Sequence, residues 1–486
     1  MNQLNTRTYQ LLLISSAFLA GVVILWGLGA LPLMSFNEAR RAIPTAGMVA
    51  SGDWLLPVLN GQLYISKPPL LYWLAGGFSA WSGEVNEWTL RLPSAITAGA
   101  VAIAVYLYAR SRFGAWPALF ALQILVANAT FAMLARRAEI EMLLSGLCFL
   151  SLLAAFRYLS SGEQRRWLRL SYVMLGLAVL AKGPVALLFV TLPLLILAAA
   201  KRERRYWRVF ADPLSWVLLL VIGASWYVLV SWHLGFDIWA STLHKDILNK
   251  VHSGGGEHAL SYALWMLADF LPFSLLLFKS PVDTIRRWWA DEQTAALLIA
   301  LLVPFLVFSA FSDKHTKYLL PVYPVLSLLL GKLLGEIFVD APARLRRAIL
   351  ACMIAMPAGY AVYYAAIEKS VFSYRYQALP EFAAWVETRA NYPVYAFGHV
   401  DERLVYYAGG HLPELDKIAF AGLKSRGAYV LVENDGADPK PTADCVVRQF
   451  KPYLKRNKSL TVLGFGPACS SGQPSRINLN PDQSIS

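Results

Sequence analysis

Long apolar stretches recur along the chain, separated by short basic connections or by longer segments of mixed composition. A helix of about 20 apolar residues is long enough to cross the hydrocarbon core of a bilayer. The stretches are Leu11–Met34, Leu92–Tyr108, Trp116–Leu134, Glu141–Leu159, a hairpin of two shorter spans at 171–200 that is broken at Lys182–Pro184, and segments near 213–232, 262–278, 294–311, 319–338 and 348–366. The pattern predicts an α-helical polytopic membrane protein with about eleven spans.

The placement of charge gives these spans an orientation. The first stretch is longer than the apolar core of a signal peptide and lacks a small-residue cleavage pattern after it, so we interpret it as a true span. With the amino terminus in the cytoplasm, the short connections 110–115, 160–169, 201–211, 279–293 and 339–347 are strongly basic. The opposite side receives the long loops 35–91 and 233–261 and the tail, as the positive-inside rule requires.

Composition excludes a cytosolic globular protein, because 57% of the 486 residues are hydrophobic and only 15% are charged, against about 25% charged in soluble domains. The net charge of +13 follows from the basic cytoplasmic connections and is not a nucleic-acid footprint. We therefore expect a multi-pass membrane protein with an external C-terminal domain and no nucleic-acid partner.

The chain divides into a membrane domain, 1–366, and a C-terminal domain, 367–486. The second part has strand-like runs at 394–397, 429–432 and 460–465 that alternate with helical patterns at 379–389 and 402–407. This alternation predicts a small α/β domain, followed by a disordered end from Ser470. Cys445 and Cys469 lie in this domain, where they either form a disulfide or remain two free thiols.

The first external loop is predicted to hold two helices, an amphipathic one at 37–51 and an apolar one at 70–81. Such helices suit the surface of a membrane, where their tryptophan and tyrosine side chains reach the headgroups. Loops of this length inside a compact protein are usually functional.

Ionisable residues near membrane depth are costly and are therefore candidates for a site. The external face gathers carboxylates and cations, which suits acid–base chemistry on an anionic substrate. Structural alternatives exist for several of them: a salt-bridged anchor for Glu139, headgroup contacts for Arg136 and Arg137, and a helix cap for Lys182. His244, His252 and His258 lack the spacing of a metal site. The main candidates are Glu38, Arg136, Arg137, Glu139, Glu141, Lys182, Lys314, His315 and Lys317.

An ordered series of motifs resembles bacterial lipid A aminoarabinose transferases and their protein O-mannosyltransferase relatives, over about residues 10–340. The motifs are Asn37–Ala42, Ser51–Pro57, Leu59–Gly61, Tyr64–Trp73, Arg91–Ser94, Glu141–Met142, Gly176–Pro184, Trp226–Tyr227 and Lys317–Pro324. The resemblance implies a C-type glycosyltransferase, which takes a sugar from a polyprenyl phosphate at the periplasmic face. It implies no nucleotide or metal, although related enzymes can recruit a divalent ion.

The resemblance also assigns roles to residues. Tyr64, Lys67, Lys250 and Tyr318 match positions that hold the carrier phosphate, and a lysine suits a leaving phosphate that gains charge. Arg40, Lys182 and Lys317 are further candidates for binding the substrate.

This chain departs from the family at the expected catalytic carboxylates. Asn37 stands where the family has a central aspartate, and an amide cannot accept a proton as a carboxylate does. Glu141 replaces another aspartate, and Arg41 stands in place of a tyrosine. Glu38 or Glu141 is then the base, or the acceptor is already anionic and needs none.

We therefore expect an inverting transfer of a sugar, aminoarabinose-like or other, from undecaprenyl phosphate to an envelope acceptor such as lipid A. Transfer to a protein hydroxyl or another envelope glycan is an alternative within the same chemistry. A transporter or flippase for a polyprenyl-linked sugar is an alternative of another class, but repeated helix breaks in two halves, typical of transporters, are not seen. A degenerate, inactive homologue is a third.

Overall fold

A computed structural model describes residues 6–239, 258, 260–389, 391–415, 423–434, 443–455 and 458–469. The chain forms two compact units. The first contains residues up to Ala30, Pro44–Pro57 and Leu63–Lys369, and the second contains Leu31–Ile43, Val58–Gln62 and the chain from Ser370. The second unit therefore includes two pieces of the segment between α1 and α4, which the division expected from the sequence places in the membrane domain.

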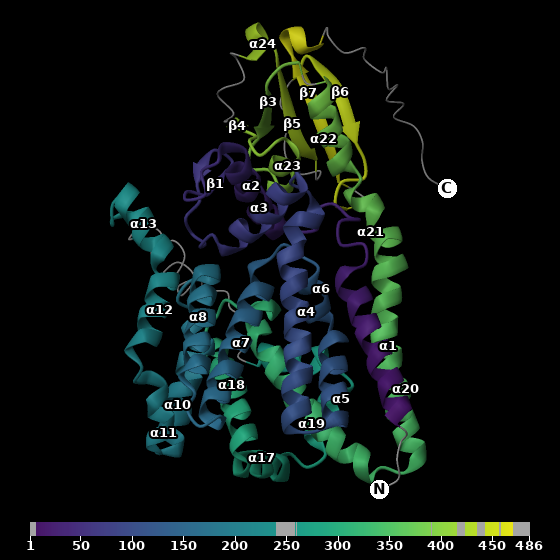
Figure 1. The fold of residues 1–486 in the computed structure, drawn as a ribbon. Coiled ribbons are helices and arrows are strands. Elements are labelled where there is room, and N and C mark those ends of the chain that lie inside the picture. Colours follow the sequence, from purple (N-terminus) through teal and green to yellow (C-terminus); the bar gives the residue numbers. More distant parts are fainter. Residues whose placement is uncertain are drawn as a thin grey trace. The chain divides into compact units, whose positions relative to one another are not determined.

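The first unit is built almost entirely of helices (Figure 1). Figure 1 shows α1 beside α20 and α7 beside α8, and both pairs pack together. The helices are α1 (Thr6–Leu25), α2 (Phe36–Ser51, shared with the second unit), α3 (Leu70–Ser82), α4 (Glu87–Arg112), α5 (Ala115–Val126), α6 (Ala129–Ala135), α7 (Ile140–Ser160), α8 (Arg165–Lys182), α9 (Ala186–Phe189), α10 (Thr191–Lys201), α11 (Arg204–Trp207), η1 (Arg208–Phe210), α12 (Pro213–Gly223), α13 (Ser225–Leu234), α16 (Ser261–Asp269), η3 (Phe273–Phe278), α17 (Pro281–Ala290), α18 (Glu292–Ser309), η4 (Thr316–Val322), α19 (Tyr323–Asp340), α20 (Ala343–Val362) and η5 (Tyr363–Ile367).

Seven helices in the described residues are long and apolar enough to cross a membrane, or eight if the bent pair α5 and α6 counts as one span. The predicted fold class, a polytopic helical membrane protein, is confirmed. Several predicted spans are broken into shorter helices: α12 and α13 meet at Ala224, and α16 is followed by the 3₁₀ helix η3 after Pro272. Proline has no N–H to continue a helical ladder, which accounts for the second break.

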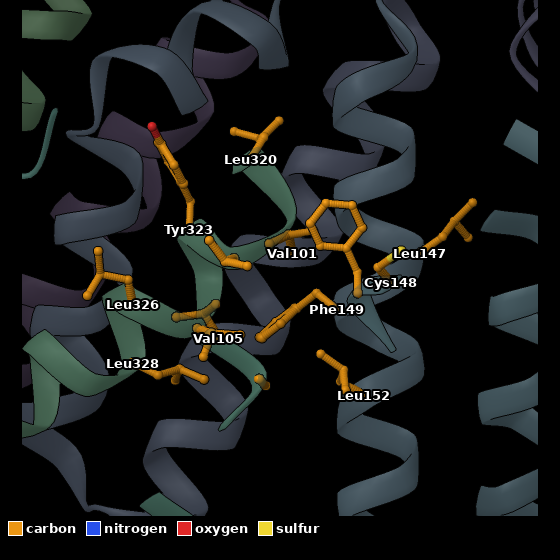
Figure 2. Close-up of a cluster of buried hydrophobic side chains, with 14 of the residues drawn as sticks. Val101, Val105, Leu147, Cys148, Phe149, Leu152, Leu320, Tyr323, Leu326 and Leu328 are labelled. Atoms are coloured by element: carbon orange, nitrogen blue, oxygen red, sulfur yellow. The ribbon is translucent and has the colours of Figure 1, made fainter. Parts of the chain in front are cut away.

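The apolar core of this unit extends over most of its helices and includes side chains of α4, α7 and α19. Side chains of the three helices point toward one another in Figure 2, with Val105, Phe149 and Leu328 among them. Glycines bring α19 close to α5: a Cβ at Gly331 would lie 2.6 Å from the Cβ of Ala121. Small residues at such crossings let two backbones approach, which is how helices gain contact in a membrane.

The second unit contains a five-stranded sheet in the order β4-β3-β5-β7-β6, with β3 parallel to β4 and β5, and β7 antiparallel to β5 and β6. Alternate residues of β5 enter two apolar clusters, Leu431 in one and Val430 in the other, as the pleat of a strand requires. This is the small C-terminal α/β domain that the sequence predicts. Its elements are α21 (Glu368–Tyr376, which begins in the first unit), α22 (Ala378–Arg389), β3 (Val394–Phe397), α23 (Glu402–Tyr407), β4 (Glu414–Leu415), α24 (Leu423–Arg426), β5 (Ala428–Asn434), β6 (Cys445–Phe450), β7 (Ser459–Phe465) and η7 (Gly466–Cys469), and the hairpin β1 (Val58–Leu59) with β2 (Gln62–Leu63) lies at the unit boundary.

Cys445 and Cys469 form a disulfide, which decides between the two alternatives left open by the sequence. Cys148 and Cys352 are free thiols in the helical unit. The bridge joins the start of β6 to the turn that follows β7, so it ties together the edge of the sheet.

Candidate active site

Two helix ends supply the charged groups of the candidate site. Glu139 stands directly before α7 and Glu141 lies in its first turn, while Lys182 is the last residue of α8. Carboxylates at a helix N-terminus and a cation at a C-terminus are both favoured by the helix dipole. Gly183 ends α8 with a φ of +87°, and a Cβ there would lie 3.1 Å from the hydroxyl of Tyr227, so both the backbone and the space favour glycine.

These groups form a connected set of ion pairs. The ammonium Nζ of Lys182 lies 3.2 Å from Oε1 of Glu141, and that of Lys317 lies 2.7 Å from Oε2 of Glu139. Lys317 is also 3.6 Å from Oε1 of Glu141. Both carboxylates are buried, Glu139 at 3% and Glu141 at 8% exposure. Buried charges persist in proteins when they are paired in this way.

Tyr318 adds an aromatic ring to the same cluster. The 3₁₀ helix η4 carries Tyr318 next to Lys317. The Nζ of Lys182 lies 4.9 Å from the centre of the Tyr318 ring, within the range of a cation–π contact. The structure therefore brings together Lys182, Lys317, Tyr318 and Glu141, four of the residues that the resemblance singled out, from three separate helices.

Lys67 belongs to the same electrostatic environment. Its positive charge interacts with that of Lys182, and its Nζ donates a hydrogen bond to the carbonyl oxygen of Ser66 at 3.0 Å. Tyr64 is fixed three residues earlier by a 2.8 Å backbone hydrogen bond to Pro57. Three lysines, Lys67, Lys182 and Lys317, thus share one electrostatic environment with Glu139 and Glu141. Lysines gathered in this way suit an anionic ligand.

The ion pair of Glu139 with Lys317 fits the salt-bridged anchor named as its structural alternative, and it also connects Glu139 to the cluster, so a role of Glu139 in the reaction stays a prediction. The two residues are 178 positions apart in the chain, so no local pattern indicates the pair. The signal that could have found it is the spacing of Glu139 and Glu141 at a predicted helix start, where both carboxylates are electrostatically favoured.

Arg136 does not contact headgroups, as one interpretation of the sequence expected, because it is buried at 7% exposure. Its guanidinium donates hydrogen bonds to the carbonyl oxygens of Val23 and Trp26 at 3.0 and 2.7 Å. Those carbonyls lie at the C-terminal end of α1, where oxygens lack partners within the helix. Arg136 is therefore a structural residue that holds the end of α1.

The other candidates from the first loop lie in the second unit. Glu38 is fully buried, and its Oε2 accepts a 2.7 Å hydrogen bond from the backbone N–H of Met34. Arg40 is ion-paired with Glu402 through its Nε at 2.8 Å. Asn37 is half-buried next to Glu38. The expected roles of these three residues in the reaction stay predictions.

Lys250, His244 and His252 lie outside the described residues. The expected role of Lys250 in binding the carrier phosphate stays a prediction, and so does the expectation that the two histidines bind no metal. Among the residues that the structure describes, no group of three or more histidine, cysteine, aspartate and glutamate side chains has the arrangement of a metal site.

Comparison with known proteins gives results consistent with this geometry. A family model described as dolichyl-phosphate-mannose-protein mannosyltransferase matches residues 66–232. An undecaprenyl phosphate-alpha-4-amino-4-deoxy-L-arabinose arabinosyl transferase of Pseudomonas aeruginosa is 28% identical over 318 residues, which cover 62% of this chain and 55% of that protein. The corresponding protein of Shewanella sediminis is 26% identical over 326 residues, covering 63% and 56%.

An uncharacterized protein of Aquifex aeolicus is 27% identical over 325 residues, or 65% of this chain and 62% of its own length. The match thus spans a little more than half of the length of these relatives, from 55% to 62%. The resemblance seen in the motifs is confirmed by these similarities.

Solved structures share the fold. The crystal structure of ArnT from Cupriavidus metallidurans bound to undecaprenyl phosphate aligns with a TM-score of 0.77 over 97% of this chain and 100% of that one, at 19% identity. The apo oligosaccharyltransferase of Archaeoglobus fulgidus aligns with a TM-score of 0.59 over 88% and 70%, at 13% identity. At these identities the likeness concerns the fold.

Proposed function

We propose that this protein is a glycosyltransferase that moves a sugar from a polyprenyl phosphate carrier to an acceptor in the bacterial cell envelope. The observation that carries the proposal is the cluster in which the buried carboxylates of Glu139 and Glu141 pair with the half-buried Lys182 and Lys317, with Tyr318 against Lys182 and Lys67 in the same electrostatic environment. The cluster lies at helix ends in a multi-span protein and brings lysines from α8 and η4 together. The similarity to undecaprenyl phosphate-dependent transferases supports the same conclusion.

On the donor side, the carrier is a phosphodiester between a sugar and a polyprenol. Attack of the acceptor oxygen on the anomeric carbon breaks the bond from that carbon to the phosphate oxygen, and the electron pair of this bond stays with the phosphate. The leaving polyprenyl phosphate therefore gains one negative charge. Lys67 and Tyr64 hold this phosphate, and Lys182 and Lys317 add positive potential where the charge develops. Displacement from the opposite face inverts the anomeric centre.

On the acceptor side, Glu141 is the candidate base within the helical unit. Its carboxylate is shared by Lys182 and Lys317, and an anionic substrate that attracts these lysines weakens their hold on Glu141. The carboxylate is then better able to accept a proton from a hydroxyl acceptor. Glu38 is the second candidate base, on the strength of the sequence resemblance.

An anionic acceptor such as a lipid A phosphate is the preferred substrate of this proposal. Asn37 occupies the position of the family's aspartate and cannot take up a proton, while a phosphate oxygen attacks without losing one. Donor and acceptor both meet the enzyme at the periplasmic face of the inner membrane, in agreement with the basic connections on the other side.

The test is sugar transfer in the host. The gene is deleted, and lipid A, the remaining lipopolysaccharide and secreted proteins are compared by mass spectrometry. The deletion strain is complemented with wild type, with Lys67→Ala, and with Lys279→Ala, an exposed lysine outside the cluster. We expect a sugar to disappear from lipid A and to return with wild type and Lys279→Ala only. A sugar lost elsewhere moves the acceptor to another envelope molecule, and unchanged envelopes contradict the proposal.

A further inference from the structure

Two pieces of the segment between α1 and α4 belong structurally to the C-terminal domain. Residues Leu31–Ile43 and Val58–Gln62 belong to the same compact unit as the chain from Ser370 onward. Ile43 enters the apolar core of that unit, and Leu59 packs against it. Asn60 pairs with the backbone of Leu412 in both directions, accepting from its N–H at 2.8 Å and donating to its carbonyl at 3.1 Å. Both segments, Leu31–Ile43 and Val58–Gln62, are thus attached to the C-terminal domain.

Side chains of the C-terminal domain also hold the backbone at Leu33 and Met34, a few residues before Glu38. The carbonyl oxygen of Met34 accepts hydrogen bonds from Nη1 of Arg403 at 3.0 Å and from the hydroxyl of Tyr376 at 3.2 Å. The N–H of Leu33 donates to the hydroxyl of Tyr407 at 3.0 Å. The backbone on both sides of the Leu33–Met34 peptide is therefore fixed by side chains of the C-terminal domain.

This fixed backbone in turn holds the Glu38 carboxylate. The N–H of Met34 donates to Oε2 of Glu38 at 2.7 Å, while the N–H of Glu38 donates to Oγ of Ser35 at 3.2 Å. A hydrogen bond from a backbone N–H to a carboxylate is charge-assisted and restricts where its oxygens can lie. Displacement of Met34 would therefore displace the carboxylate.

Arg403 is itself rigidly held. Its Nε and Nη2 bind the two carboxylate oxygens of Asp401 at 2.8 and 2.7 Å. This bidentate arrangement fixes the plane of the guanidinium and points Nη1 at Met34. The N–H of Asp401 donates in turn to Glu433 on strand β5 at 2.9 Å. A continuous chain of contacts runs from the sheet through Asp401, Arg403 and Met34 to Glu38.

We propose that Arg403, together with Tyr376 and Tyr407, is a positioning residue for Glu38, so that the C-terminal domain sets the geometry of a reactive carboxylate on the first loop. This inference rests on the proposed function, in which Glu38 acts on the acceptor. The C-terminal domain would then contribute to sugar transfer by holding the Glu38 carboxylate in position.

The test is a double-mutant cycle in the full-length protein. Tyr376→Phe removes only a hydroxyl, and Arg403→Lys keeps the charge but cannot bind Asp401 in a bidentate manner while reaching Met34. Each substitution is combined with Glu38→Gln. Initial rates of sugar transfer are measured in membranes of the host, which contain the native donor and acceptor, per amount of folded enzyme. Tyr395→Phe, on strand β3, is the control outside this set of contacts.

We expect each substitution alone to lower the transfer rate about tenfold and to leave the dissociation constant for added undecaprenyl phosphate unchanged. In the Glu38→Gln background the same substitutions should lower the rate less than about twofold, because their effect passes through Glu38. Equal factors in both backgrounds would show a purely structural role and overturn the inference.

Failure of the inference and failure of the proposed function are separate outcomes. If Glu38→Gln leaves the rate unchanged while Lys67→Ala abolishes it, the transferase stands and the positioning role is wrong. If Lys67→Ala leaves transfer unchanged, the role of Lys67 at the carrier phosphate is wrong; if membranes with the wild-type protein transfer no more sugar than membranes of the deletion strain, the proposed function itself is wrong. Hydrogen exchange gives a readout without activity: the amides of residues 33–38 should exchange faster in Tyr376→Phe and Arg403→Lys, while those of strand β7 keep their wild-type protection.

Discussion

The carboxylate of Glu141 and the ammonium of Lys182 lie 3.2 Å apart, although 41 residues separate them in the chain. They come from the beginning of α7 and the end of α8, which pack side by side. The pair therefore depends on the packing of two helices, and it is positioned where the two helix dipoles favour both charges. Its proximity to Lys317 and Tyr318 makes it the centre of the candidate site.

Variants of Lys182 should show that its effect on sugar transfer is distinct from its effect on thermal stability. Lys182→Met is expected to reduce sugar transfer about hundredfold and to lower the thermal unfolding midpoint, because Glu141 loses one of its two lysines inside the protein. The double variant Lys182→Met with Glu141→Gln removes both charges and should recover part of the midpoint but none of the transfer. Recovery of transfer in the double variant would mean that the pair is only structural.

The pair of Glu139 and Lys317 makes a second test of the cluster. Glu139→Gln should weaken transfer at least tenfold, since Lys317 would lose its 2.7 Å ion pair and with it a fixed position in the cluster. Glu84→Gln changes an exposed glutamate of the same unit and serves as the matched control. Transfer rates in host membranes decide the matter, and equal rates for the two variants would remove Glu139 from the site.

The C-terminal domain should lose stability in acid through Asp401. Burial alone raises the pKa of this carboxyl, but the hydrogen bonds and the charge of Arg403 outweigh burial and bring the pKa below its ordinary value. A lowered folded-state pKa means that the stabilisation is complete above the ordinary aspartate pKa of about 3.9 and is lost as the pH falls through the folded-state value.

The measurement is the thermal unfolding midpoint against pH for wild type and Asp401→Asn. We expect the wild-type advantage to be constant above about pH 5 and to shrink below about pH 4. Glu433 contributes with the opposite sign, since burial raises its pKa, so the difference between wild type and Glu433→Gln should shift in favour of wild type on acidification. A pH-independent difference for Asp401→Asn would contradict the assignment.

Gly331 should tolerate no side chain. A Cβ at this position would lie 2.6 Å from both the Cβ and the backbone nitrogen of Ala121, so α19 would have to move away from α5. Gly331→Ala is expected to cost about 1–3 kcal/mol in unfolding free energy. Gly99→Ala on α4, where a Cβ meets nothing within 4 Å, should instead be neutral or stabilising. Similar losses for both variants would show that the close helix contact is not the cause.

The sequence predicts the fold class of this protein better than it predicts helix breaks and contacts between distant residues. Apolar periodicity and basic connections are local signals, so the helical membrane class and the α/β character of the tail could be predicted. The breaks at Ala224 and before η3 were missed, because a long apolar run looks the same whether one helix or two carry it.

The site shows the same limit. Lys182 and Glu141 were recognised as unusual, because ionisable residues next to apolar spans are costly. Their partnership, and that of Glu139 with Lys317, arises from packing between distant helices and leaves no trace in local sequence. Attachment of the first loop to the C-terminal domain is still less visible, since Met34 and Arg403 are 369 positions apart. The disulfide could be suspected but not assigned, because pairing depends on distance.

The central claim is that the lysine–glutamate cluster serves a polyprenyl phosphate. The most direct measurement is the binding of undecaprenyl phosphate to the purified, full-length protein, followed as a rise in the unfolding midpoint with ligand concentration. We expect saturable binding by wild type and Lys279→Ala, and at least tenfold weaker binding by Lys67→Ala. Absence of saturable binding, or equal binding by wild type and Lys67→Ala, would contradict the claim.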